Sequence, residues 1–180
     1  MGPHSMAEVL EDARHCRPDP VRVEDSMAPP YRIVLADDHS LFRDGVKRII
    51  KNSRGLEVTG EAGDGLELLD FLQSSRTAPD LIVLDITMPK IQGLDVAREI
   101  KQRYPGVKVL FLTMHKSKEH FLRAISLGAE GYLLKEDTHQ DLIAAIKTIR
   151  EGGTYISPLM AENLEDLVAT KVNSIKSGRA

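Results

Sequence analysis

The sequence predicts an α/β protein, a doubly wound parallel sheet of five strands with helices on both faces. Across residues 31–153, short apolar runs alternate with amphipathic stretches, which is typical of repeated strand–helix units. Most of these runs are apolar at every position, as expected of strands that are covered on both faces. Successive strand ends lie 22 to 28 residues apart, which leaves room for one helix, one strand and two short loops.

The predicted strands differ in how completely apolar they are. Continuous apolar runs occupy residues 33–36, 81–84, 109–112 and 132–134. Residues 56–62 instead alternate apolar and polar side chains, which suits a less covered strand at the edge of the sheet. The sequence therefore predicts five strands, one of them at an edge.

Helical periodicity fills the segments between the strands. The first and last helices are predicted from apolar residues that recur with the spacing of one buried helix face. Weaker versions of the pattern predict helices over residues 66–73, 94–104 and 118–127. The two strong stripes consist of Phe42, Val46, Ile49 and Ile50, and of Leu142, Ala145, Ile146 and Ile149.

Polar residues stand at the ends of the predicted strands. Asp37 and Asp38 follow the first strand, Asp85 the third, Thr113 the fourth and Lys135 the fifth. Right-handed crossovers bring the carboxyl ends of all the strands to one edge of the sheet, where open α/β proteins bind ligands. Each residue alone has an ordinary explanation, such as a helix cap for the two neighbouring aspartates. Their coincidence at one edge predicts a functional site.

The side chains at this edge favour phosphate chemistry. Clustered carboxylates repel one another unless a cation stabilises their charged forms. Mg²⁺ suits such a site, because it binds through one or two carboxylates and completes its shell with waters and phosphate oxygens. Asp85 is the candidate nucleophile, which would accept a phosphoryl group as an acyl phosphate. Thr113 and Lys135 would then neutralise the phosphoryl oxygens.

Short motifs surround these positions. They are Asp37-Asp38; Asp85 with Met88-Pro89 and Gly93; Leu112-Thr113; and Gly128-Ala129 followed by Gly131-Tyr132-Leu133-Leu134-Lys135. Together they resemble the receiver domain of bacterial two-component response regulators, over residues 31–153. The sequences of residues 112–115 and 131–135 are similar to those of the receiver subfamily that carries a LuxR-type (NarL/FixJ-like) helix-turn-helix output. One departure is Glu136, where many receivers have proline, but this subfamily often lacks that proline.

The resemblance implies a flavodoxin-like fold with the strand order 2-1-3-4-5. It implies that a sensor histidine kinase phosphorylates Asp85, and that Mg²⁺ is held by Asp37, Asp38, Asp85 and the backbone carbonyl of Thr87. On this interpretation the chain is not an enzyme that turns over a substrate. It is a phosphoacceptor that supports its own phosphorylation and dephosphorylation.

The resemblance also implies a switch. Thr113 and Tyr132 match the family's switch hydroxyl and switch aromatic. A phosphoryl group would draw Thr113 and Lys135 inward and repack the helix between them. The surface around residues 114–150 would then change its preference for partners, including a second copy of the chain. Tyr132 is equally well explained as an ordinary core aromatic.

Three regions are expected along the chain. Residues 1–30 are rich in proline and have no sustained period, which predicts a flexible arm whose first six residues have the form of a cloning scar. Residues 31–153 are the expected receiver. Residues 154–180 are expected to hold a linker helix, over 159–169, and a tail. They are too short for a helix-turn-helix, so we expect DNA binding only through a domain that this chain lacks.

Composition excludes several other functions. The net charge is −3 and no segment has an excess of basic residues, so the chain alone should bind DNA poorly. No apolar run approaches the roughly 20 residues of a membrane-spanning helix. The single cysteine, Cys16, cannot form an internal disulfide. These features predict a cytoplasmic protein with no membrane contact.

Three alternatives remain open at this stage. The chain could be a stand-alone receiver that acts through protein contacts. A phosphatase of the haloacid dehalogenase type also uses an aspartate nucleophile and Mg²⁺, but it needs an acid two residues later, where Thr87 stands. A flavodoxin-like cofactor binder would share the architecture, although an acidic cleft would repel a flavin phosphate.

Overall fold

A computed structural model of the chain describes residues 28–162 and 164. The arm predicted for residues 1–30 lies outside the described residues except for its last three, and the predicted cloning scar lies outside them altogether. The tail beyond residue 164 is likewise outside. The predicted receiver, residues 31–153, is described in full.

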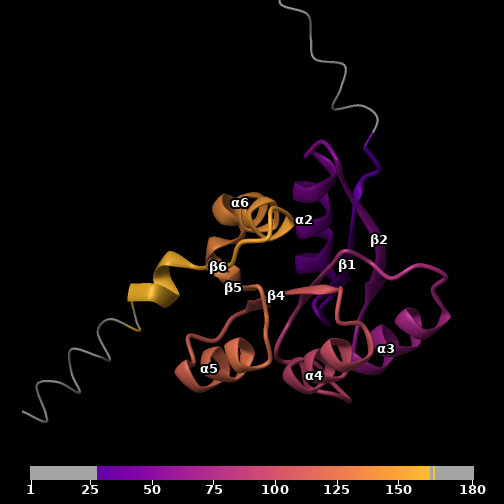
Figure 1. Cartoon of the computed structure of the whole chain (residues 1–180). Coiled ribbons are helices and arrows are strands. Elements are labelled where there is room, and N and C mark those ends of the chain that lie inside the picture. Colours follow the sequence, from indigo (N-terminus) through magenta and orange to yellow (C-terminus); the bar gives the residue numbers. More distant parts are fainter. Residues whose placement is uncertain (1–27, 163, 165–180) are drawn as a thin grey trace, which may run out of the picture.

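A single parallel sheet has the strand order β2-β1-β3-β4-β5-β6 (Figure 1). The predicted α/β fold and the order 2-1-3-4-5 are therefore confirmed, and β2 lies at an edge, as its alternating pattern indicated. The strands are β1 (Tyr31–Ala36), β2 (Leu56–Ala62), β3 (Leu81–Leu84), β4 (Lys108–Thr113), β5 (Gly131–Leu134) and β6 (Tyr155–Ile156).

The sheet has one strand more than the five predicted. The short strand β6 pairs in parallel with β5. The amides of Tyr155 and Ser157 donate hydrogen bonds to the carbonyls of Glu130 and Tyr132, at 3.0 and 2.8 Å. Two residues are too few to show an alternating pattern, so the sequence indicated only a break in the pattern here. Backbone pairing with β5, rather than side-chain periodicity, creates this strand.

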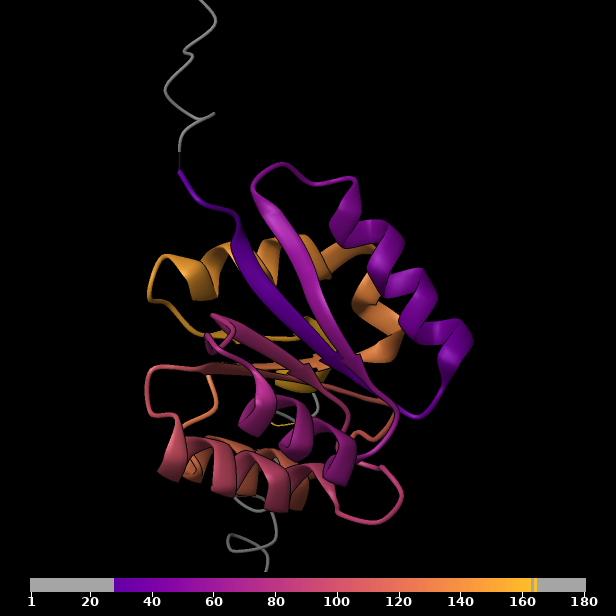
Figure 2. The same cartoon turned by 90° about the vertical axis from the view of Figure 1, so that its right-hand side faces the viewer.

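Helices cover both faces of the sheet (Figure 2). One core cluster joins α2 and α6 to side chains such as Ile33 and Leu35 of β1. The other joins α3, α4 and α5 to the alternating residues Val34 and Ala36. The helices are α2 (Ser40–Lys51), α3 (Gly65–Ser74), α4 (Gly93–Arg103), α5 (Lys118–Ser126) and α6 (Thr138–Arg150), with a 3₁₀ turn, η3 (Lys135–Asp137), between β5 and α6.

Local hydrogen bonds set the start of α3, next to the carboxyl end of β2. The Asp64 carboxylate accepts from the Glu67 amide at 2.9 Å, and the Glu67 carboxylate accepts from the Gly63 amide at 2.6 Å. This pair of bonds caps the amide of Glu67, which the helix leaves free, and holds the amide of Gly63 just before the cap. It turns the chain sharply from β2 into α3.

A further helix begins at Pro158, continues through Glu162 and includes residue 164. Met160 is fully buried in the core on the side of α3, α4 and α5. The start of the linker helix predicted for 159–169 is thereby confirmed, and its remaining part lies outside the described residues. None of the helices in the described part of the chain is long and apolar enough to cross a membrane.

Candidate functional site

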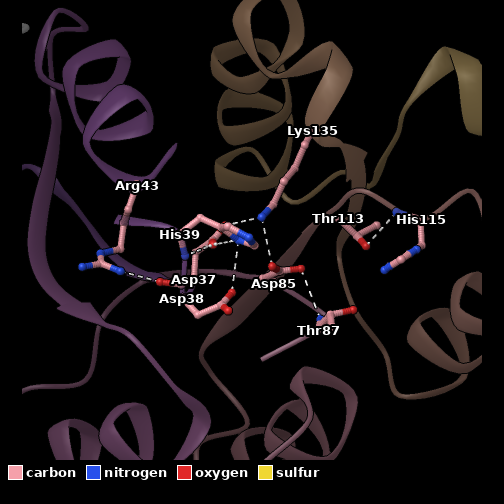
Figure 3. Close-up of polar contacts among 9 residues, drawn as sticks. All are labelled: Asp37, Asp38, His39, Arg43, Asp85, Thr87, Thr113, His115 and Lys135. Atoms are coloured by element: carbon pink, nitrogen blue, oxygen red, sulfur yellow. Dashed lines mark hydrogen bonds and ion pairs between the residues drawn. The ribbon is translucent and has the colours of Figure 1, made fainter. Parts of the chain in front are cut away.

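The carboxyl ends of β1, β3, β4 and β5 meet at one edge of the sheet and bring the predicted residues together (Figure 3). Asp37 follows β1 and Asp85 follows β3, where the Asp85 amide donates to the Ala36 carbonyl at 2.9 Å. Thr113 ends β4 and Lys135 directly follows β5. Asp37, Asp85, Thr113 and Lys135 are all buried.

Lys135 lies between two carboxylates. Its Nζ is 2.6 Å from Asp37 Oδ2 and 2.9 Å from Asp85 Oδ2, and its side chain is only 4% exposed. The ammonium also lies 4.6 Å from the centre of the Phe42 ring. Buried charges are tolerated only when paired, so this single cation compensates the charge at the ends of both β1 and β3.

Asp85 is held from two sides. One oxygen accepts from Lys135 Nζ, and the other accepts from the Thr87 amide at 3.2 Å. Burial raises the pKa of the Asp85 carboxyl, and the charge of Asp37 adds to the rise, while Lys135 and the Thr87 amide oppose it. Burial has the largest effect. The side chain is therefore a desolvated carboxyl whose charged form depends on nearby cations.

The acidic cluster fits a hard divalent cation. Asp37, Asp38, His39 and Asp85 each offer one ligand atom, and these atoms lie within 4.8 Å of one another. Asp37 Oδ2 is buried without a hydrogen bond. It lies 2.6 Å from Lys135 Nζ, which is close enough for an ion pair, but the two groups are not aligned for a hydrogen bond. Oxygen ligands with unused acceptor capacity suit Mg²⁺. The ligand role predicted for the Thr87 carbonyl stays a prediction.

The loop after β4 is tied to the site at two points. The Thr113 hydroxyl accepts from the His115 amide at 3.2 Å, and the Tyr132 hydroxyl donates to the His115 carbonyl at 3.3 Å. Tyr132 is fully buried, and its ring packs edge-on against Phe121 with the ring centres 5.3 Å apart. Tyr132 is thus a core aromatic in this state. The switching roles of Thr113 and Tyr132 stay predictions.

Two residues at the site were not singled out from the sequence. His39 directly follows the aspartate pair, and its Nδ1 lies 3.2 Å from both Asp37 Oδ1 and Asp38 Oδ1. Arg43, on α2, donates a hydrogen bond to the backbone carbonyl of Asp37. The adjacency of His39 to the aspartates was a usable signal. Arg43 gave none, because a cation on an amphipathic helix is typical of a solvated face.

Comparison with known proteins places this site in a family. The family described as response regulator receiver domain matches residues 33–147, a range that includes Asp37, Asp85, Thr113 and Lys135. The chain belongs to the response regulator receiver family.

Relatives of this receiver are response regulators. The transcriptional regulatory protein DegU of Brevibacillus brevis is 42% identical over 133 residues, which cover 74% of this chain and 56% of DegU. The response regulator UvrY of Escherichia coli (strain K12) is 33% identical over 132 residues, covering 73% of this chain and 60% of UvrY. The receiver chain thus spans less than two thirds of either protein.

A solved structure extends the likeness to three dimensions. The two-component response regulator of the LuxR family from Aurantimonas sp. SI85-9A1 has 33% sequence identity and a TM-score of 0.72, over 78% of this chain and 99% of that chain. The resemblance to LuxR-type receivers is therefore confirmed.

Tyr132 should make the receiver sensitive to alkaline pH. Burial raises its pKa to about 12, whereas an unfolded tyrosine titrates near pH 10. As the pH rises, the Tyr132 hydroxyl therefore loses its proton in the unfolded state before it does so in the folded state. The free energy of unfolding keeps the full contribution of Tyr132 below about pH 10 and falls by about 2 to 3 kcal/mol as the pH rises to 12. We expect urea unfolding of Tyr132→Phe between pH 9 and 11.5 to show a shallower loss than the parent. Tyr31, whose pKa is also raised, contributes the same loss in both proteins. Parallel plots of unfolding free energy against pH for the parent and Tyr132→Phe would therefore contradict the prediction.

Proposed function

We propose that this receiver accepts a phosphoryl group on Asp85 from a sensor histidine kinase, in the cytoplasm. The observation that carries the proposal is the position of Asp85, a buried carboxylate at the end of β3, beside a second carboxylate and in contact with Lys135. An Asp85 oxygen would attack the phosphorus of a phosphohistidine. The P–N bond breaks as the O–P bond forms, and the leaving imidazole takes up a proton from solvent.

The residues around Asp85 suit this transfer. Asp37, Asp38 and Asp85, with the Thr87 carbonyl, would hold Mg²⁺, which when bound offsets the negative charge of phosphoryl oxygens. Lys135 supplies a second positive charge that is already desolvated, and charge in such surroundings acts more strongly than in water. Thr113 supplies a hydroxyl from the neighbouring strand. Phosphoryl transfer needs mainly positioning and charge neutralisation.

A phosphoryl group on Asp85 would also act as the signal. It adds nearly two negative charges and three strong acceptors, to which Lys135 and the Thr113 hydroxyl can bond. Each charge-assisted bond contributes about 1.5 to 3 kcal/mol, and about 5.5 kcal/mol turns a two-state equilibrium from almost off to almost on. Movement of Thr113 would reach His115, and through its carbonyl Tyr132. Residues 114–150 would then present a changed surface, including to a second copy of the chain.

The output we propose is regulation of transcription. DegU is named a transcriptional regulatory protein, and the receiver spans only part of its length. DNA binding would come from a separate helix-turn-helix domain, while the receiver itself carries no basic excess. A stand-alone receiver acting by protein contacts is the alternative output. Turnover as a phosphatase is disfavoured, because exposed Thr87 stands where that chemistry needs an acid.

Intact-mass analysis after incubation with acetyl phosphate and Mg²⁺ tests the proposal. We expect one added phosphoryl group on the parent chain, none on Asp85→Asn and none when EDTA replaces Mg²⁺. Asp95→Asn is the matched control, since Asp95 lies exposed on α4, and it should label like the parent. Equal labelling of Asp85→Asn and the parent would refute the assignment. Release of many equivalents of phosphate from an ester substrate would favour the phosphatase.

A further inference from the structure

Arg43 connects three elements of the receiver: its own helix α2, the end of β1 and the edge strand β2. It projects from α2, and its side chain is only 19% exposed. One terminal nitrogen, Nη1, donates to the backbone carbonyl of Asp37. Its Nε donates to Glu61 Oε2 at 3.0 Å. The guanidinium therefore bridges the end of β1 and the edge strand β2 (Figure 3 draws the contact with Asp37).

Glu61 holds the guanidinium in place. Its other oxygen accepts from Lys47 Nζ at 2.6 Å, so both carboxylate oxygens are occupied by cations from the same helix. The hydrogen bond from Lys47, and then that from Arg43, lowers the pKa of Glu61 against the opposing effect of burial. The planar guanidinium of Arg43 is thus held in one orientation by its bonds to Glu61 and to the Asp37 carbonyl, unlike that of a solvated surface arginine.

The turn that Arg43 contacts is the one that presents the acidic pair. The Asp37 amide donates to the Ala62 carbonyl of β2 at 3.1 Å, and the Asp37 carbonyl accepts from Arg43. The Asp37 carboxylate in turn accepts from the His39 amide at 2.8 Å. The direction of this carboxylate therefore depends on the backbone of residues 37–39, and Arg43 is the side chain bonded to that backbone from α2.

We propose that Arg43 is a positioning residue for the metal site. Glu61 orients the Arg43 guanidinium, and the guanidinium holds the Asp37 carbonyl. These contacts keep the Asp37 and Asp38 carboxylates directed at the same point. Groups that orient metal ligands from behind typically change metal affinity by about 10- to 100-fold when they are removed. The inference rests on the proposed function for its cation, Mg²⁺, but not on phosphoryl transfer.

Mg²⁺ titrations followed by amide chemical shifts of residues 37–39 and 85–88 test this role directly. We expect Arg43→Gln to weaken Mg²⁺ binding about tenfold. Arg43→Lys keeps the charge but cannot bridge Asp37 and Glu61 as a fork, so it should also bind more weakly than the parent. Glu61→Gln, which leaves Arg43 present but less well oriented, should weaken binding in the same direction and serves if the Arg43 variants do not fold.

Arg48→Gln is the matched control. Arg48 is exposed on the same helix, so this variant removes one positive charge without touching the turn, and its affinity should stay within about twofold of the parent. An Arg43→Gln affinity equal to that of Arg48→Gln would overturn the inference. Full recovery in Arg43→Lys would overturn it too, because charge alone would then suffice. Intact-mass labelling of the same samples reports separately on phosphoryl transfer, so either idea can fail without the other.

Discussion

Lys135→Met is expected to lower the free energy of unfolding by about 3 to 5 kcal/mol in metal-free buffer, the usual result of removing one partner from a buried ion pair. Lys135 Nζ lies 2.6 Å from Asp37 Oδ2 and 2.9 Å from Asp85 Oδ2, and all three side chains are at most 7% exposed. Methionine fills similar volume but leaves two buried carboxylates without their cation. Urea unfolding in EDTA measures the loss.

Mg²⁺ should restore part of this loss. A ligand that binds only the folded state stabilises it more the more tightly it binds, and the variant's carboxylates have no competing ammonium. We therefore expect added MgCl₂ to stabilise Lys135→Met more than the parent. Lys116→Met is the control, because its pair with Glu136 is 3.4 Å long and largely exposed; such pairs contribute at most about 1 kcal/mol. A loss in Lys135→Met as small as that in Lys116→Met would contradict the expectation.

Most of the sheet could be predicted because each buried strand has its own apolar run. Residues 81–84 are buried at every position in β3, and the edge position of β2 followed from its alternation. β6 could not be predicted, because its two residues carry no period and depend on backbone bonds to β5. Side-chain periodicity thus predicts a strand whose own side chains are buried in the core, but it cannot predict a strand that forms only through backbone bonds to its neighbour.

The candidate site divides in the same way. Asp37, Asp85, Thr113 and Lys135 could be placed from sequence, because a residue at a strand end has its position set by the sheet topology. Arg43 could not, because its contact with the Asp37 carbonyl depends on how α2 packs across β1 and β2. The roles in phosphorylation and switching, unlike the positions, remain predictions.

Gly93→Ala should be the most disruptive small substitution near the site. A Cβ at Gly93 would lie 2.0 Å from the Asp85 carbonyl oxygen and 2.9 Å from Ile86 Cα, and neither is the end of a flexible side chain. The Gly93 amide also donates to the Ile86 carbonyl at 2.8 Å, so the start of α4 cannot withdraw without losing this bond. We expect a destabilisation of about 3 kcal/mol, at the upper end of typical overpacking effects.

Gly45→Ala separates this close approach from the general effect of adding a methyl group. Gly45 lies exposed within α2, and a Cβ there would have nothing within 4 Å, so alanine should stabilise the receiver by about 0.5 to 1 kcal/mol. Urea unfolding compares the two variants. Because the clash at Gly93 falls on the backbone of Asp85 itself, acetyl phosphate labelling should also slow in Gly93→Ala and not in Gly45→Ala. A Gly93→Ala variant as stable as Gly45→Ala would show that the backbone after β3 yields easily, and that Asp85 is less rigidly held than its contacts indicate.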